Sequence, residues 1–184
     1  MSFRIRGIHD SFLPVNRRAI EQILKITASE IADMTDEALD KIRGLFTCPV
    51  INRMRHYFFV AENSHGDILG FAQMSHSLDM NFCFLDLLAN NPAKRTGGIG
   101  EALYNRAREE AKFLNASGLF LECMSDDPAL LSDTSLLKQN RARLKFYERL
   151  GARPLLNPAF EKHCHEYYGN PYFLLFDSLG RSEE

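Results

Sequence analysis

The stretch RTGGIGEALYNRAREEA, residues 95–111, places three glycines at the start of an amphipathic helix. Ile99, Leu103 and Ala107 recur at helical spacing, and charged side chains occupy another stripe of the helix. Glycine weakens helices, so glycines at this position need a reason other than helix formation. The N–H groups of a first helical turn lack intrahelical partners and attract anions, which glycine allows to approach closely. The stretch therefore predicts an anion-binding turn, with a tight strand-to-helix connection as the structural alternative.

Two common phosphate-binding motifs do not fit this turn. The P-loop of nucleotide hydrolases ends in Gly-Lys-Ser/Thr, and a dinucleotide fingerprint has the spacing GxGxxG near the first strand of the chain. The pattern present here is Arg95-x-x-Gly98-x-Gly100, with Lys94 adding a second positive charge. This pattern favours a diphosphate ligand, but its spacing alone does not decide between such a ligand and a structural turn.

Strands and helices flank the turn on both sides. Apolar and polar alternation, helical periodicity and turn residues predict the elements. Strands are predicted over residues 3–8, 56–62, 68–77, 81–89, 118–125, 152–156 and 172–179, and helices over residues 14–31, 35–46, 98–115 and 140–150.

Three features of these elements carry the fold prediction. The NSHGD turn at residues 63–67 makes the second and third strands a hairpin. Residues 81–89 are almost wholly apolar, which predicts a central strand buried on both faces. A strand, a helix and a strand follow one another around residues 98–115, which predicts a parallel crossover. The sequence therefore predicts a mixed α/β (α+β) fold.

Composition limits the classes of function. The chain has 184 residues, of which 45% are hydrophobic, and this predicts a single globular domain over residues 1–184. A formal net charge of −2 gives no basic field for nucleic acid, and no apolar run predicts a membrane helix or a signal peptide. Four cysteines without a CxxC pair indicate a reduced, cytoplasmic protein. The His163-Cys164-His165 cluster is too weak a pattern to predict a metal site.

The string LDLLANNPAKRTGGIGEAL, followed by a strand and by NRARLKFYERLGARP, resembles the GNAT superfamily of N-acetyltransferases. The resemblance covers about residues 1–177. It implies a mostly antiparallel central sheet with a parallel central β-α-β crossover and flanking helices. It also implies acetyl-CoA as co-substrate, no metal, an amine acceptor that is either a small molecule or a protein, and the option of a homodimer.

The resemblance assigns the cofactor site residue by residue. Arg95, Gly98 and Gly100 match the loop that binds the pyrophosphate of acetyl-CoA, and Asn140 and Tyr147 match positions of a later helix. In this family the strand before the loop pairs with the pantetheine arm. The cofactor contacts implied in this way are Leu88, Ala89, Asn90, Arg95, Thr96, Gly97, Gly98, Ile99, Gly100, Glu101, Asn140 and Tyr147. Two positions depart from the family pattern, because Asn90 replaces an apolar residue and Arg143 replaces an alanine.

Three residues are candidates for the chemistry of acetyl transfer, which requires a base for the amine and an acid for the leaving thiolate. Tyr147 is the candidate acid, because a phenol donates a proton at neutral pH and because the family often uses this tyrosine. Asp86, nine residues before Arg95, is the candidate base, with a structural carboxylate as the alternative. Glu122 is a second candidate base, a substrate anchor or a solvated strand end.

These observations predict an N-acetyltransferase that transfers the acetyl group by direct attack in a ternary complex. The alternative is a non-catalytic acyl-CoA sensor or interaction domain of the same fold. Residues 126–139 are predicted as a loop, and the segment Met124–Gln139, longer than is usual in the family, either forms an acidic wall of the acceptor site or is a surface insertion. The sequence does not identify the amine.

Overall fold

The computed structural model describes residues 2–31, 34–94, 97–155, 159 and 172–181. The chain divides into two compact units, Met1–Ala116 and Ser117–Glu184, and each is described by itself. The N-terminal unit contains β1 (Arg4–Ile8), α1 (Pro14–Glu30), α2 (Asp36–Leu45), β2 (Val50–Ile51), β3 (Met54–Glu62), β4 (Ile68–Ser77), β5 (Cys83–Asn90), the 3₁₀ turn η1 (Pro92–Lys94) and α3 (Ile99–Phe113). The C-terminal unit contains β6 (Leu119–Met124), α4 (Thr134–Arg149), β7 (Arg153–Leu155) and β8 (Tyr172–Asp177).

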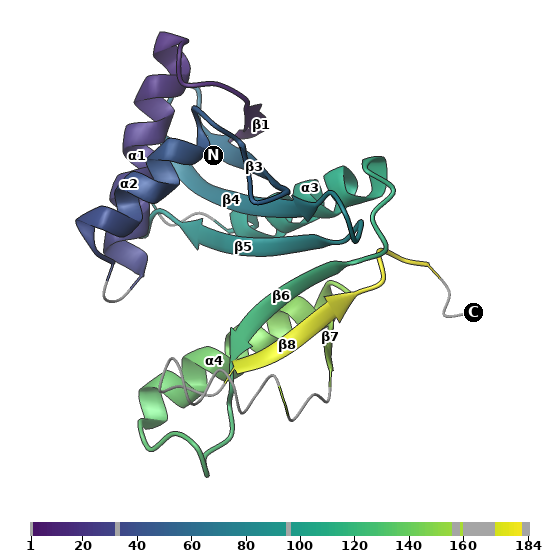
Figure 1. The fold of residues 1–184 in the computed structure, drawn as a ribbon. Helices are drawn as coiled ribbons and strands as arrows, with labels where there is room; N and C mark the ends of the chain where they lie inside the picture. Colours follow the sequence, from purple (N-terminus) through teal and green to yellow (C-terminus); the bar gives the residue numbers. More distant parts are fainter. Residues whose placement is uncertain (1, 32–33, 95–96, 156–158, 160–171, 182–184) are drawn as a thin grey trace. The chain divides into compact units, whose positions relative to one another are not determined.

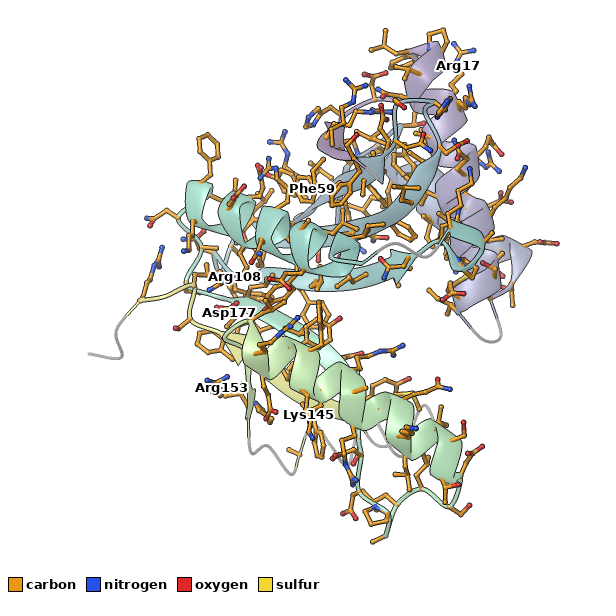
Figure 2. All side chains as sticks on the ribbon, turned by 180° about the vertical axis from the view of Figure 1, so that it is seen from behind. Arg17, Phe59, Arg108, Lys145, Arg153 and Asp177 are labelled. Atoms are coloured by element: carbon orange, nitrogen blue, oxygen red, sulfur yellow. The ribbon has the colours of Figure 1, made fainter. Side chains whose placement is uncertain are left out.

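The strands of the N-terminal unit form an antiparallel sheet in the order β1-β3-β4-β5, and the short β2 pairs with β3. Side chains alternate between the two faces of a strand. Phe58 and Val60 of β3 therefore pack in one core cluster with α1 and α2, whereas the ring of Phe59 lies 4.6 Å from the guanidinium carbon of Arg106 on α3. Helices α1 and α2 thus cover one face of this sheet and α3 covers the other (Figure 1). Figure 2 shows α3 in front of the strands, with Phe59 labelled behind it.

The buried strand of this sheet is β4 rather than β5. Every residue of β4 is buried, whereas β5 is exposed at Asp86 and Asn90 and half-buried at Leu87. The prediction that residues 81–89 are buried on both faces is therefore wrong. The two strands are similarly apolar in sequence, and α1 and α3 pack against both, but both helices contact β4 more extensively than β5.

In the C-terminal unit, β8 pairs antiparallel with β6 on one side and with β7 on the other. Helix α4 packs against β6, and Figure 2 shows it in front of the strands of this unit. Gly118 precedes β6 at a point where a Cβ would overlap the ring of Phe176, so a side chain there would displace that ring.

Most predicted elements are confirmed, and so is the mixed, mostly antiparallel α/β fold class. The hairpin of β3 and β4 turns at Gly66, which has a φ of 76°, and Thr35 caps α2 by accepting from the N–H of Ala38. One boundary is wrong, because α4 begins at Thr134 and not at Asn140. The reason is Asp133, whose carboxylate accepts from two N–H groups of the first turn and caps the helix. Within the described residues, no helix is both long enough and apolar enough to cross a bilayer.

Candidate functional site

The turn before α3 is open on the side that an anion would approach. Gly98 is the N-cap of α3 with a φ of 82°, a conformation that favours glycine, and it offers the helix no side-chain cap. Gly97 does not have a positive φ, yet a Cβ built on either glycine has no described atom within 4 Å. Among the described residues no packing contact requires a glycine at position 97, and the space beside both glycines would let a ligand approach the N–H groups of α3. Arg95 and Thr96, the other predicted residues of this turn, lie outside the described residues.

Gly70 of β4 brings together three residues that are predicted to contact the cofactor. A Cβ on Gly70 would lie 2.9 Å from the carbonyl oxygen of Ala89, 2.9 Å from a methyl carbon of Ile99 and 3.0 Å from the side-chain oxygen of Asn90. The absence of a side chain at Gly70 therefore lets the start of α3 lie close to the end of β5. Sequence analysis missed this residue, because an isolated glycine in a strand gives only a weak signal of close approach.

The connection between β5 and α3 is held by polar contacts. Asn91 donates from its side chain to the carbonyl of Ile68 at 3.0 Å, and Lys94 forms an ion pair with Asp67 at 2.6 Å. The hydrogen bond from Lys94 is the main reason why the pKa of Asp67 is lowered. The charge of Lys94 is thus balanced by Asp67, and its main contact anchors the connection to the β3–β4 turn.

Asp86 occupies a β-bulge in β5. Gln73 of β4 pairs with Leu87 and the next residue, Met74, pairs with Leu85, so Asp86 is the extra residue of the bulged strand. A bulge interrupts the pairing and redirects a side chain, and bulges are common next to active sites. Asp86 is exposed, and its carboxylate accepts a hydrogen bond of 3.2 Å from the hydroxyl of Ser75. The bulge gives the candidate base a position on the surface of a strand that is otherwise largely apolar.

Tyr147 and Asn140 lie on the buried side of α4, two turns apart, as predicted. Tyr147 is 7% exposed and Asn140 is 2% exposed. Burial raises the pKa of Tyr147 to about 12, so its phenol keeps its proton at neutral pH. The amide of Asn140 donates to the carbonyl of Ser125 at 2.9 Å, and this bond ties the loop after β6 to α4. Asn140 therefore has a structural contact that sequence analysis did not predict.

Glu122 and Tyr147 lie on opposite faces of the C-terminal sheet. The thiol of Cys123 is close enough to α4 that Arg143 lowers its pKa, although burial raises that pKa to about 11 overall. Cys123 thus faces α4, and strand alternation turns Glu122 to the other face. Glu122 is exposed, but partial desolvation still raises the pKa of its carboxyl.

The aspartates between β6 and α4 all have partners within the C-terminal unit. Asp126 forms an ion pair of 3.1 Å with Arg141, Asp127 accepts from the N–H of Ala129, and Asp133 caps α4. Among the described residues, no group of three His, Cys, Asp or Glu side chains could hold a metal ion. The His163-Cys164-His165 cluster lies outside the described part of the chain.

A sequence family described as Acetyltransferase (GNAT) domain matches residues 54–151, which include β3, the bulge, the glycine turn and all of α4. The chain belongs to the GNAT acetyltransferase family. No curated protein matches the chain.

Solved structures with the GNAT fold cover nearly the whole chain at low sequence identity. An aminoglycoside 6'-N-acetyltransferase complexed with coenzyme A has a TM-score of 0.68 and 16% identity, covering 98% of this chain and 99% of that one. The aminoglycoside 6'-N-acetyltransferase from Enterococcus faecium has a TM-score of 0.67 and 15% identity, covering 98% and 99%. N-acetylglutamate synthase from Neisseria gonorrhoeae, complexed with coenzyme A and N-acetyl-glutamate, has a TM-score of 0.59 and 17% identity, covering 98% of this chain and 36% of that one. At these identities the comparison shows the fold.

The structure gathers part of the predicted GNAT site within the N-terminal unit. Ala89, Asn90 and Ile99 meet around Gly70, directly beside the open turn at Gly97 and Gly98. This turn fits the diphosphate of acetyl-CoA, because a Cβ would fill the space that its glycines leave free.

Proposed function

We propose that this chain is an N-acetyltransferase that transfers an acetyl group from acetyl-CoA to an amine acceptor by direct attack in a ternary complex. The observation that carries the proposal is the open turn at Gly97 and Gly98, at the N-terminus of α3 in a GNAT domain. Acetyl-CoA supplies the acetyl group as a thioester. The backbone of residues 97–101, with Arg95 and Thr96, binds the diphosphate, and Leu88, Ala89 and Asn90 of β5 lie along the pantetheine arm.

Asp86 and Tyr147 have the proton-transfer roles in this proposal. Asp86 accepts a proton from the attacking amine, directly or through a water molecule, and Ser75 holds its carboxylate. Tyr147 donates a proton to the departing thiolate, and its raised pKa keeps it in the donor form. Glu122 stays the alternative base, because desolvation raises the pKa of its carboxyl and so makes its carboxylate a stronger base.

A non-catalytic acyl-CoA sensor is the second candidate, because the glycine turn alone would serve binding. A bulge that exposes a carboxylate on β5 favours the enzyme, since a sensor does not require a base. The amine acceptor is a small molecule or a protein. A cytoplasmic location and a homodimer also stay part of the proposal, and light scattering would test the homodimer.

Release of CoA thiol from acetyl-CoA in the presence of a panel of amines tests the proposal. Asp86→Asn should lower kcat/KM by about 10²–10⁴ and remove the rise of kcat/KM with pH. Asp79→Asn, the same change at another exposed carboxylate, which pairs with Arg53, is the matched control and should leave the rate unchanged. Binding of acetyl-CoA without acetylation of any amine would favour the sensor. A pH-dependent rise that persists in Asp86→Asn would assign the base role to Glu122 or to the amine itself.

A further inference from the structure

Polar side chains interrupt the apolar face of the N-terminal sheet that α1 and α2 cover. Phe58 of β3 and Leu87 of β5 pack in the core of this face, and both pair with Gln73 of β4. Residues directly opposite in a sheet point to the same face, so Gln73 lies between two apolar neighbours. Two residues further along β4, Ser75 lies opposite His56 of β3, and its hydroxyl donates a hydrogen bond to Asp86. We call His56, Gln73, Ser75 and Asp86 the polar row.

Gln73 is buried with an unused hydrogen-bond acceptor. Gln73 is 6% exposed, and none of the described residues donates a hydrogen bond to its Oε1 atom. A buried polar atom without a partner destabilises the folded protein, because it has lost its hydrogen bonds with water. Such atoms are rare in native proteins and each needs a reason. An apolar side chain of the same size would destabilise the fold less at this position, so packing does not explain the amide.

His56 repeats this feature beside Gln73. Its Nδ1 atom is buried and has no partner among the described residues. Burial lowers the pKa of His56, so the ring is neutral at pH 7 and adds no positive charge to the row. His56 also lines a cavity with Phe46 and Phe58, at the end of α2, where their rings lie 4.0 Å apart. The polar row therefore has unused hydrogen-bonding atoms on the same face as the candidate base.

We propose that Gln73 determines acceptor specificity by accepting a hydrogen bond, through Oε1, from a second donor group on the acceptor amine. The inference rests on the proposed function, because the reacting nitrogen must lie at Asp86. Gln73 and Ser75 are two residues apart on one face of β4, which separates them by about 7 Å. The acceptor class that fits is a small amine with a hydroxyl or a second amino group a few atoms from the reacting nitrogen. The row contains no lysine or arginine, so it does not favour a carboxylate in that place.

A series of amines with one backbone tests the inference. The probes are n-butylamine, 4-amino-1-butanol and 4-aminobutanoate, assayed by release of CoA thiol. In the wild type, kcat/KM for 4-amino-1-butanol should exceed that for n-butylamine by about tenfold, which is the effect of one net hydrogen bond. The value for 4-aminobutanoate should be the lowest of the three.

Gln73→Met removes the amide and keeps the length of the side chain. The tenfold preference should fall to about onefold in this variant, with kcat/KM for n-butylamine and the KM for acetyl-CoA unchanged. Because an unpartnered polar atom is removed, its melting temperature should be equal to or higher than that of the wild type.

Gln22→Met is the matched control, because Gln22 of α1 uses both ends of its amide. It donates to the carbonyl of Gly66 at 3.1 Å and accepts from the N–H of Ile68 at 2.9 Å. This variant should be less stable than the wild type and should keep the preference among amines. A preference that is equal in wild type and Gln73→Met overturns the inference, and so does a wild type that binds acetyl-CoA but does not acetylate 4-amino-1-butanol. A wild type that does not bind acetyl-CoA overturns the proposed function itself.

Discussion

The two units hold their candidate site residues in different surroundings. In the N-terminal unit, the turn at Gly97 and Gly98 faces open space and Asp86 is exposed on its bulge. In the C-terminal unit, Asn140 and Tyr147 are almost fully buried, and Asn140 holds the loop after β6. A substitution in the first unit can therefore alter binding with little effect on stability. In the second unit, each of these side chains contributes both to packing and to the proposed site. Only a conservative substitution can therefore separate its effect on stability from its effect on activity.

Tyr147→Phe should give the largest effect, because it keeps the buried ring and removes the proton donor. We expect kcat to fall by about 10²–10⁴, with the KM for acetyl-CoA little changed. Since burial raises the pKa of Tyr147 to about 12, titration of this phenol should not lower the wild-type rate near the ordinary tyrosine pKa of 10.0. Steady-state kinetics as a function of pH measure both quantities.

Tyr104→Phe is the control for this variant, because Tyr104 of α3 is fully buried and has no role in the proposed chemistry. It should leave kcat unchanged. A kcat for Tyr147→Phe equal to that of the wild type, under conditions where chemistry limits the rate, would leave Tyr147 with a packing role alone.

Gly97→Val and Gly98→Val should weaken CoA binding by about 2–4 kcal/mol each, because a branched side chain enters the space of the diphosphate. The two variants should differ in stability. Gly98 has a φ of 82°, so valine there adds backbone strain, whereas Gly97 does not have a positive φ. Calorimetry with CoA and thermal unfolding measure the two effects separately.

Gly44→Val provides the comparison in open space on another helix, because a Cβ on Gly44 of α2 also meets no described atom. It should leave CoA affinity unchanged. An unchanged affinity in Gly97→Val would mean that the glycine turn is structural and does not bind the diphosphate.

Local patterns in the sequence predict much of this fold and part of the site. The glycine turn and the seven-residue spacing of Asn140 and Tyr147 are local, so helical geometry alone places these two side chains on one face of α4. The bulge at Asp86 is not local, because it depends on the register between β4 and β5. The contacts of Gly70 likewise depend on how α3 packs on the sheet.

The two wrong predictions have the same kind of cause. Hydrophobicity marks both β4 and β5 as strands but does not tell which of them the helices cover more completely. The start of α4 was not predicted, because aspartate is also common in loops. Only the structure shows that Asp133 caps the helix by accepting hydrogen bonds from Ser135 and Leu136. Both errors concern the surroundings of an element rather than its existence.

Asn140→Ala should have an intermediate effect, on stability. It removes the 2.9 Å bond to the carbonyl of Ser125 and leaves that buried carbonyl without this donor, which should cost about 1–3 kcal/mol. Urea unfolding measures the free energy, and Gln139→Ala, at the exposed neighbouring position, should change it little. Unfolding free energies that agree between wild type and Asn140→Ala would contradict a structural role and leave the predicted cofactor contact as the function of this side chain.

The smallest effect should come from Asp126→Asn with Asp127→Asn, in the segment between β6 and α4. A free acidic wall of the acceptor site would attract a cationic amine, but Asp126 already pairs with Arg141, and Asp127 accepts from the N–H of Ala129. Arg141 is 56% exposed, so its ion pair with Asp126 is worth about 0–1 kcal/mol. Asparagine can also accept the hydrogen bond from Ala129, so we expect stability and the KM for the amine to change little. Kinetics at low and high salt, with the active amine of the panel, measure this. A clear rise in the amine KM that shrinks at high salt, with the acetyl-CoA KM unchanged, would show that these carboxylates act on the acceptor despite their partners.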